Sequence, residues 1–326
     1  MSTIPPSSIP GWKLCDLNDA LAGTPKPPWV IEGLLPKQSA HLVAAHPHSL
    51  KSLSWLQACI EAAAPAHKTV WGHFPAPDVK NTLFIETEDP GWMVEERIRG
   101  IAKGLGLSSL SDASGFRYIA KGPMALLNEE KNLQALIQQN NTDFFILSTL
   151  QNMLGPGRSL KDDEDMQPIS AMVLRLAQLC PGVLLTHSPW DKRQKRAAGT
   201  VTLAANFLTT SHFEKIQKGR TGETFVHVLL DSKAGATETD FTLRLETDAG
   251  EVRKVVYVCA GRPKGFARDD VRDAIAADPS ASNKEIAERA GVSARYVRRI
   301  REEQAEKEAM PSCANEVLEG SGKDAR

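Results

Sequence analysis

The chain contains 326 residues, with 39 lysines and arginines against 40 aspartates and glutamates, so its formal net charge is −1. This length is typical of about two domains, and the hydrophobic content of 41% excludes a wholly disordered chain. No run of about 18 apolar residues predicts a membrane span, and the N-terminus lacks the basic and apolar regions of a secretory signal. Five widely separated cysteines fit reduced thiols, so we expect a cytoplasmic protein with no membrane partner and no cysteine-based metal site.

The order of apolar and polar segments divides the chain into four parts. Residues 1–27 are rich in proline and serine and predict an N-terminal arm. Residues 28–262 alternate short apolar runs with helical patterns, which predicts βαβ units and a parallel sheet. Residues 268–304 predict a small helical domain, and the polar residues 305–326 predict a disordered tail.

Strands and helices alternate through most of residues 28–262. The predicted strands are 39–45, 82–86, 116–120, 144–147 and 182–186, and the predicted helices are 52–64, 93–101, 133–139 and 169–179. After residue 198 only strands follow, at 225–230, 241–245 and 252–259, with a tight turn at 248–250. Because such turns join antiparallel neighbours, the expected fold is α/β, a parallel sheet with antiparallel edge strands.

The loop between the first predicted strand and the first predicted helix is close to a phosphate-binding loop. It reads Ala45-His-Pro-His-Ser-Leu-Lys-Ser52, whereas the P-loop pattern is G-x-x-x-x-G-K-[ST]. Both glycines are replaced, by Ala45 and Leu50, and glycine matters here because it allows unusual dihedral angles and close approach to phosphate. The alternative is an ordinary helix start. We predict ATP and Mg²⁺ as cofactors, with Ser52 on the metal and a cofactor-binding loop of His48, Ser49, Leu50, Lys51 and Ser52.

Three further segments extend this loop into a family resemblance. They are Pro28-Trp-Val-Ile-Glu-Gly-Leu-Leu-Pro36, Leu83-Phe-Ile-Glu-Thr-Glu-Asp-Pro90, and Thr186-His187 at the end of an apolar strand. With the loop, residues 28–246 resemble the RecA-like P-loop ATPases of the plasmid RepA type, which are hexameric replicative helicases and their mobile-element relatives. The resemblance implies a RecA-like P-loop NTPase core, self-association as a hexamer, and partners from replication or mobile-element systems.

The resemblance also implies roles for two residues at strand ends. Glu88 resembles the glutamate that orients the attacking water, and His187 resembles the polar sensor at the end of the last core strand. A carboxylate at the carboxyl end of a strand lies beside the phosphate site of an open α/β sheet, which supports this role for Glu88. The alternatives are that Glu88 belongs to an acidic cap of the next helix, with Pro90 at its first position, and that His187 is an ordinary loop histidine.

Two positions depart from the family. Ser148 stands where the family has the Walker B aspartate, and Asp143 lies at the wrong end of the same strand. Ala198 stands where the family has an arginine that reaches across a subunit interface. The nearby Arg193 and Arg196 are alternatives for that arginine, but we favour a solvated basic loop over a finger there, and a nucleic-acid contact by this loop stays open. An arginine finger contributes roughly 10³–10⁵ in rate and a single electrostatic donor roughly 10²–10³, so these losses predict very slow or absent hydrolysis.

Residues 282–301 have the spacing of a helix-turn-helix. Ser282 and Glu285 predict a capping box, Gly291 predicts the turn, and Ser293 predicts the cap of a second helix. This resemblance implies a small all-α DNA-binding domain, and the alternative is a protein-docking bundle with a solvated basic face. The residues predicted to contact phosphates or base edges are Arg295, Tyr296, Arg298, Arg299 and Arg301.

Three functions remain in competition. We favour a DNA-binding RecA-like protein of a replication or mobile-element system that binds ATP with weak or lost hydrolysis. The second is an active hexameric helicase, with its metal held by Ser52 and Glu86 or Glu88. The third is a non-enzymatic DNA-binding regulator or assembly factor that uses the α/β domain as a scaffold. The near-zero net charge does not exclude DNA, because the seven acids and three bases of residues 302–326 offset the arginines of the preceding helix.

Overall fold

One nine-stranded sheet organises the α/β part of the protein. The structure is a computed structural model that describes residues 28–187, 190–191, 196–197, 205–217, 223–235, 239–248, 251–260, 271–272, 274–276, 278–290 and 293–309. The strands of the sheet are β3 (Ala40–Ala45), β6 (Thr82–Glu86), β7 (Phe116–Ala120), β8 (Phe144–Ser148), β9 (Gly182–Thr186), β12 (Thr209–Gln217), β13 (Thr224–Ser232), β14 (Asp240–Asp248) and β15 (Glu251–Ala260).

The strand order across this sheet is β15-β14-β13-β12-β3-β9-β8-β6-β7. All neighbours from β12 to β7 run parallel, whereas β12, β13, β14 and β15 pair antiparallel in succession. The predicted α/β fold, with a parallel sheet and antiparallel edge strands, is therefore confirmed. In a parallel sheet the carboxyl ends of the strands meet at one edge, so this topology gathers the ends of β3, β6, β8 and β9.

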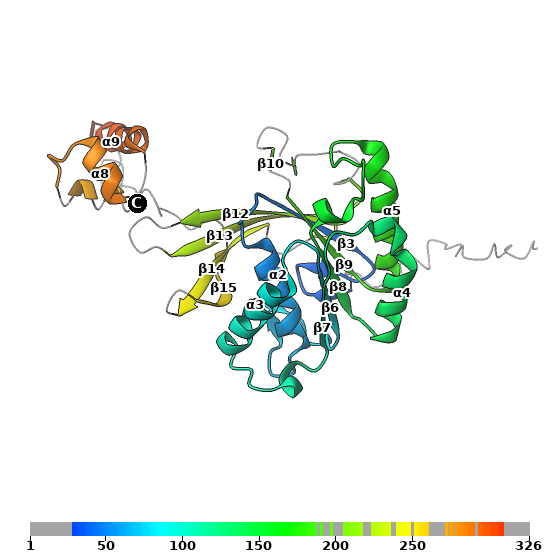
Figure 1. Ribbon diagram of the computed structural model, residues 1–326. Helices are drawn as coiled ribbons and strands as arrows, with labels where there is room; N and C mark the ends of the chain where they lie inside the picture. The colour runs from blue at the N-terminus through cyan, green and yellow to red at the C-terminus, as the bar shows by residue number, and fades with distance from the viewer. Residues whose placement is uncertain are drawn as a thin grey trace, which may run out of the picture.

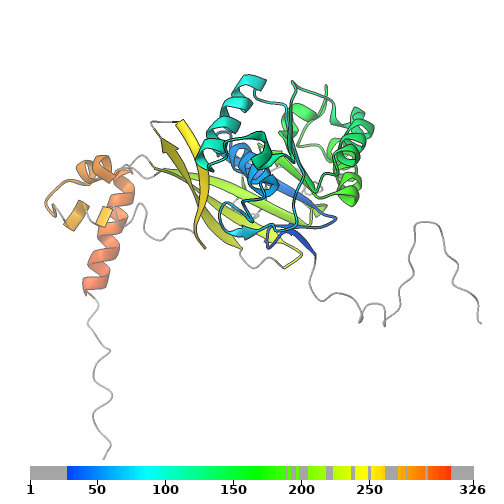
Figure 2. The same cartoon turned by 90° about the horizontal axis from the view of Figure 1, so that it is seen from below.

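Helices cover both faces of the parallel part of the sheet (Figure 1). One buried cluster includes Trp55 and Ile101 from the helices of one face, and a second includes Ile137 and Met172 from those of the other. The antiparallel strands lie beside the pair of helices that contributes Trp55 and Ile101, in both views (Figure 2). The first face carries α2 (Lys51–Ala63) and α3 (Gly91–Gly104), and the second carries α4 (Glu130–Gln139) and α5 (Asp163–Leu179).

Short elements complete the described part of the core. Three two-stranded pairs are β1 (Trp29–Ile31) with β2 (Leu35–Pro36), β4 (Thr69–Val70) with β5 (Phe74–Pro75), and β10 (Trp190–Asp191) with β11 (Arg196–Ala197). The 3₁₀ helices are η1 (Leu110–Ala113), η2 (Leu126–Asn128) and η3 (Leu150–Met153). No helix of the described part of the chain is both long and apolar enough to cross a membrane.

Strand β12 is the main element that the sequence pattern did not predict. It reads Thr-Thr-Ser-His-Phe-Glu-Lys-Ile-Gln, with few apolar residues, yet it pairs with the phosphate-loop strand β3. Its buried polar groups are satisfied inside the sheet, since Ser211 Oγ lies 2.8 Å from His41 Nε2 and His212 Nδ1 lies 3.1 Å from Ala44 O. This strand therefore joins the parallel and antiparallel parts through polar contacts as well as through its ladder.

Several helices extend beyond their predicted ends, and two of them do so by five residues or more. Helix α5 begins at Asp163 rather than at residue 169, because Asp162 caps it by accepting a hydrogen bond from Glu164 N at 2.9 Å. Three acidic residues in its first turn complement the positive end of the helix. Helix α9 (Ala294–Ala309) runs past residue 304, so the predicted disordered tail begins instead with helix, in a segment of strong helix formers.

The C-terminal helices α8 (Asn283–Ala290) and α9 form a small unit with its own core. Ser282 N donates to Glu285 Oε2 at 2.8 Å and Glu285 N donates to Ser282 Oγ at 3.3 Å, which is the predicted capping box. Ser293 Oγ accepts from Tyr296 N at 3.3 Å and begins α9 as predicted. The buried side chains of this core include Val271, Ile286, Val297 and Ile300.

Some predictions concern residues outside the described part of the chain. These are the arm at residues 1–27, Arg193, Ala198, the turn residue Gly291 and residues 310–326. Of Arg196 only the backbone is described, in β11.

Candidate nucleotide-binding site

The loop before α2 contains a left-handed residue at the position where the P-loop pattern has its second glycine. Leu50 precedes the first residue of α2 and has φ 66° and ψ 8°, and His48 has φ 60°. Glycine adopts this conformation most readily, and a residue with a Cβ pays about 1–2 kcal/mol for it. The half-buried Leu50 side chain packs on the core cluster that includes Trp55, and this contact offsets part of the strain. A leucine therefore holds the backbone conformation that the motif assigns to glycine.

The N-terminus of α2 lacks the side chains that usually bond to the free backbone N–H groups of a helix start. No side chain caps it, and its first turn contains no acidic residue. Ser49 is buried, and its hydroxyl has no hydrogen-bond partner among the described residues. Unpaired N–H groups and the positive end of the helix dipole favour anions. This helix end, together with the unpartnered hydroxyl, is suited to a phosphate group.

Lys51, the first residue of α2, is only 3% exposed. Burial lowers the pKa of its ammonium from 10.5 to about 8, and the negative charges of Glu88, Glu86 and Asp89 act in the opposite direction. In the part of the chain that the structure describes, no carboxylate oxygen lies within 4.0 Å of Lys51 Nζ. Buried lysines are rare without an ion pair, so this ammonium is suited to an anionic ligand.

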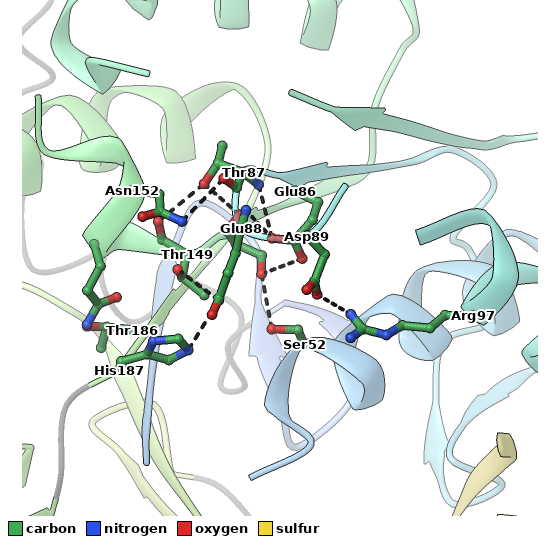
Figure 3. A network of polar contacts seen from close by, with 12 residues as sticks. Ser52, Glu86, Thr87, Glu88, Asp89, Arg97, Thr149, Asn152, Thr186 and His187 are labelled. Carbon is green, nitrogen blue, oxygen red and sulfur yellow. Dashed lines mark hydrogen bonds and ion pairs between the residues drawn. The ribbon is translucent and has the colours of Figure 1, made fainter. Parts of the chain in front are cut away.

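The carboxyl ends of β6 and β8 bring polar side chains to the start of α2 (Figure 3). Glu86 and Ser148 are direct partners in the register of the two strands. Ser148 Oγ lies 2.9 Å from Glu86 Oε2 and 3.1 Å from Ser52 Oγ. The backbone N–H groups of Thr87 and Glu88 donate to Glu86 Oε1 at 3.0 and 2.9 Å. Burial raises the pKa of Glu86, and the hydrogen bonds from Glu88 N and Ser148 Oγ act against this rise.

Glu88 and His187 lie next to each other at the same edge (Figure 3). His187 Nε2 is 3.3 Å from Glu88 Oε2, and Thr149 Oγ1 donates to the same oxygen at 3.3 Å. Burial is the main cause that lowers the pKa of His187, and the charge of Lys51 adds to it, which favours a neutral imidazole at pH 7. The structure thus brings together the two residues predicted as water-orienting acid and sensor.

The neighbouring acids have structural partners instead. Helix α3 begins at Gly91, so Pro90 is its N-cap and not its first residue, and no side chain caps it. The alternative in which Glu88 caps this helix is therefore wrong. Asp89 forms an ion pair with Arg97 of α3. Asp143 Oδ2, at the opposite end of β8, accepts from Lys80 N at 2.7 Å and from Asn81 N at 2.8 Å.

Polar residues after β8 link the strand ends, and the sequence analysis missed them. Asn152 Nδ2 donates to Thr87 O at 3.2 Å (Figure 3). Gln151 Nε2 donates to Thr186 Oγ1 at 3.1 Å. Both residues lie in η3, directly after the buried strand. The only sequence feature that could have indicated them is a polar segment at the carboxyl end of an apolar strand.

The oxygen groups at this edge suit Mg²⁺. Hydroxyl and carboxylate oxygens are the hard ligands that this ion prefers, and they are provided by Ser148 together with Ser52 and Glu86, each within hydrogen-bonding distance of Ser148. The described residues contain no group of three or more His, Cys, Asp or Glu side chains that could hold a metal alone. Mg²⁺ usually keeps several waters and binds through substrate phosphates, and this sparse donor set fits that mode.

Comparison with known proteins places the chain in a family. A family model described as an AAA domain matches residues 6–193, more than half of the chain. The chain belongs to the AAA domain family. No curated protein matches it in sequence. Among solved structures, a KaiC-like protein from the hyperthermophilic archaeon Pyrococcus horikoshii OT3 is similar, with a TM-score of 0.50 and 10% identity over 71% of this chain and 94% of that chain. At this identity the likeness shows the fold alone, which is RecA-like.

The AAA domain match ends before the C-terminal helices, so the basic face of α9 is a separate feature. A hollow of about 390 Å³ on α9 is lined by four of the five residues predicted to bind DNA. The guanidinium of Arg299 lies 4.9 Å from the ring centroid of Tyr296, and Arg298 Nε donates to Glu302 Oε1 at 3.0 Å. The four residues are Arg295, Tyr296, Arg298 and Arg299.

Arg301 has a different environment from the other four. Its guanidinium donates to Pro279 O at 3.2 Å and to Ala281 O at 2.6 Å. These bonds fasten α9 to the segment before α8, so we assign Arg301 a structural role in place of its predicted contact with DNA.

Proposed function

We propose that this AAA domain protein is a DNA-binding RecA-like protein that binds ATP with Mg²⁺ and hydrolyses it slowly or not at all. The observation that carries the proposal is the convergence of Lys51, Ser52, Glu86 and Glu88 on the uncapped N-terminus of α2. In this arrangement Lys51 and the loop N–H groups bind the β and γ phosphates, and Ser52 holds the metal. Bound Mg²⁺ would neutralise charge on the phosphate oxygens.

Slow hydrolysis follows from what the site lacks. Glu88 next to His187 is placed to orient a water near the γ phosphate, but the Walker B position holds the neutral Ser148. The loop also lacks both glycines of the motif, which allow the backbone to approach a phosphate closely. Turnover well below that of a helicase is therefore expected.

The proposed setting is a replication or mobile-element system. The resemblance of residues 28–246 to RepA-type helicases supports self-association as a hexamer, with partners from such a system. The C-terminal unit supports DNA binding as a helix-turn-helix, because the arginines that line its hollow form the electrostatic footprint of a nucleic-acid surface. In this proposal α9 is the recognition helix.

Equilibrium binding of a fluorescent ATP analogue, combined with phosphate release by the same protein, tests the nucleotide part. We expect Mg²⁺-dependent binding that Lys51→Met weakens and that Lys103→Met, at an exposed position of α3, preserves. We expect phosphate release to stay slow with and without single-stranded DNA. Wild-type protein that binds no nucleotide would leave only the DNA-binding regulator. Fast release that DNA stimulates and Lys51→Met abolishes would show an active helicase.

A further inference from the structure

The Walker B position has lost its acid, but an acid lies directly across from it. Ser148 ends β8, and its partner in the register is Glu86, which ends β6. We propose that Glu86, held by Ser148, supplies the missing negative charge and orients the water shell of the nucleotide-bound Mg²⁺. This inference rests on the proposed binding of ATP with Mg²⁺. It makes Glu86 a positioning residue, while Ser52 remains the residue in contact with the metal.

Glu86 is a buried acid without a cationic partner. The residue is 1% exposed, and its carboxylate accepts hydrogen bonds from Thr87 N, Glu88 N and Ser148 Oγ, all of which are neutral donors. No Lys, Arg or His nitrogen among the described side chains lies within 4.0 Å of it. The charge of Lys51 is near enough to interact with Glu86 but forms no ion pair with it, and a buried carboxylate without an ion pair destabilises a fold. A cation that arrives with the nucleotide would supply that counter-charge.

The hydroxyl groups of Ser52 and Ser148 connect this acid to the metal position. Ser148 has one hydroxyl proton, and the Glu86 carboxylate at 2.9 Å is a stronger acceptor than the Ser52 hydroxyl at 3.1 Å. Because the Glu86 carboxylate draws the single Ser148 proton, the Ser52 oxygen 3.1 Å away does not receive that proton and stays available to a cation. The negative charge of Glu86 thus acts on the Ser52 position through one intervening hydroxyl.

Glu88 does not compete for this role. Its Oε2 contacts His187 Nε2 and Thr149 Oγ1, both at 3.3 Å, and its side chain is 39% exposed. Glu86 has no contact with His187 in the described structure and faces Ser148 instead. The two carboxylates therefore have different roles in this proposal. Glu88 faces the side of the site with the water and the sensor His187, and Glu86 faces the side with the metal.

The test compares the affinity for a fluorescent ATP analogue in Mg²⁺ and in EDTA. We expect wild-type protein to bind more tightly in Mg²⁺, and Glu86→Gln to lose roughly 10–100-fold of that gain, as is typical of groups that orient metal ligands. Glutamine keeps the acceptor for Thr87 N and Glu88 N, and its amide can donate to Ser148 Oγ, so affinity in EDTA should stay unchanged. Adding Ser148→Asp to Glu86→Gln should restore the gain, because it returns the charge to β8.

Three further results decide between the explanations. Ser148→Ala leaves the carboxylate in place but breaks its link to Ser52, so it should lower the Mg²⁺ gain in the same direction by a smaller factor. If wild type and Glu86→Gln show the same Mg²⁺ gain, the role of Glu86 is wrong while the proposed nucleotide binding stands. If wild-type protein binds no analogue in either buffer, the proposed nucleotide function fails, and the inference fails with it.

Discussion

Helix α2 carries a buried charge near each end, and the fold satisfies only one of them. Glu61 is 4% exposed, and its carboxylate oxygens accept from Gln57 Nε2 at 3.0 Å and from Trp71 N at 2.6 Å. Lys51 is 3% exposed and has no ion pair among the described residues. Burial shifts both groups toward their neutral forms, raising the pKa of Glu61 to about 7 and lowering that of Lys51 to about 8.

The difference between the two ends separates structure from function. Around Glu61 the hydrogen bonds close on the protein itself, since Gln57 Nε2 also donates to Val255 O of β15 at 2.6 Å and ties the helix to the sheet. Around Lys51 the helix end is uncapped and the neighbouring Ser49 hydroxyl has no described partner. Burial alone does not distinguish the two groups, whereas the count of satisfied hydrogen bonds does.

Lys51→Met should give the largest effect on nucleotide binding. An unchanged affinity would contradict the distinction between the functional Lys51 end and the structural Glu61 end of α2. The pKa of Lys51 is lowered from 10.5 to about 8, so burying the charged lysine reduces the free energy of unfolding by about 3 kcal/mol. This reduction is complete below pH 8 and absent above pH 10.5, where the lysine is neutral in both the folded and the unfolded state. The variant should therefore be more stable at pH 7 without nucleotide, yet bind ATP roughly 10–100-fold more weakly. Urea unfolding and analogue binding measure the two effects. A less stable variant with unchanged affinity would make Lys51 a structural residue.

Glu61→Gln should change stability at the other end of the helix without changing binding. Because the pKa of Glu61 is raised from 4.5 to about 7, the contribution of Glu61 to the free energy of unfolding falls by about 3 kcal/mol as the pH rises from 4.5 to 7. Above pH 7 this contribution is constant. Urea unfolding from pH 4.5 to 8 should show this loss of stability for wild type relative to the variant. The positive charge of the neighbouring Lys254 lowers the pKa of Glu61 and so opposes the effect of burial. Parallel stability curves for the two proteins would contradict the assignment.

Charge reversal on α9 extends the comparison to exposed charges. Arg298→Glu with Arg299→Glu should weaken duplex DNA binding roughly 10-fold or more at moderate salt and reduce the dependence of log K on log salt by about 2. Arg99→Glu, at an exposed arginine of α3, is the matched control and should leave binding unchanged. Fluorescence anisotropy at several salt concentrations measures both quantities. Equal binding by all three proteins would leave α9 as a protein-docking face.

Leu50 gives the smallest effect and sharpens the account of the loop. At φ 66°, Leu50→Ala loses the packing and keeps the strain, whereas Leu50→Gly loses the packing and relieves the strain. The glycine variant should therefore be about 1 kcal/mol more stable than the alanine variant and bind the ATP analogue at least as tightly as wild type. Thermal unfolding and analogue titration provide the check. An alanine variant more stable than the glycine variant would show that the residue does not hold the left-handed conformation.

Apolar periodicity predicted most of the fold. The runs that became β3, β6, β8 and β9 are fully buried strands, so their apolar character was sufficient to place them. Strand β12 was not predicted, because its buried Ser211 and His212 are satisfied by hydrogen bonds with a distant part of the chain, which the local sequence pattern cannot show. The start of α5 escaped because its first turn is acidic and carries no apolar stripe.

The candidate site was predicted in its residues but not in its pairings. The P-loop motif indicated Lys51 and Ser52, the family resemblance indicated Glu88 and His187, and the structure brings the four residues to one edge. The partnership of Glu86 with Ser148 depends on the register of two strands that are separated by many residues, so the sequence showed a missing acid and offered Glu86 or Glu88 as an alternative metal ligand, but not this pairing. Arg301 appeared equivalent to its neighbours on α9, and only the tertiary contacts to Pro279 and Ala281 set it apart.

A crystal structure of the protein with a non-hydrolysable ATP analogue and Mg²⁺ tests the central claim most directly. The account predicts that the β and γ phosphates lie on the N-terminus of α2, with Lys51 Nζ bonded to them and Ser52 Oγ on the metal. It also predicts that Leu50 keeps its left-handed backbone and turns its side chain toward the core cluster. A saturated crystal in which the Leu50 side chain fills the phosphate position, and the analogue binds elsewhere or not at all, would contradict the account.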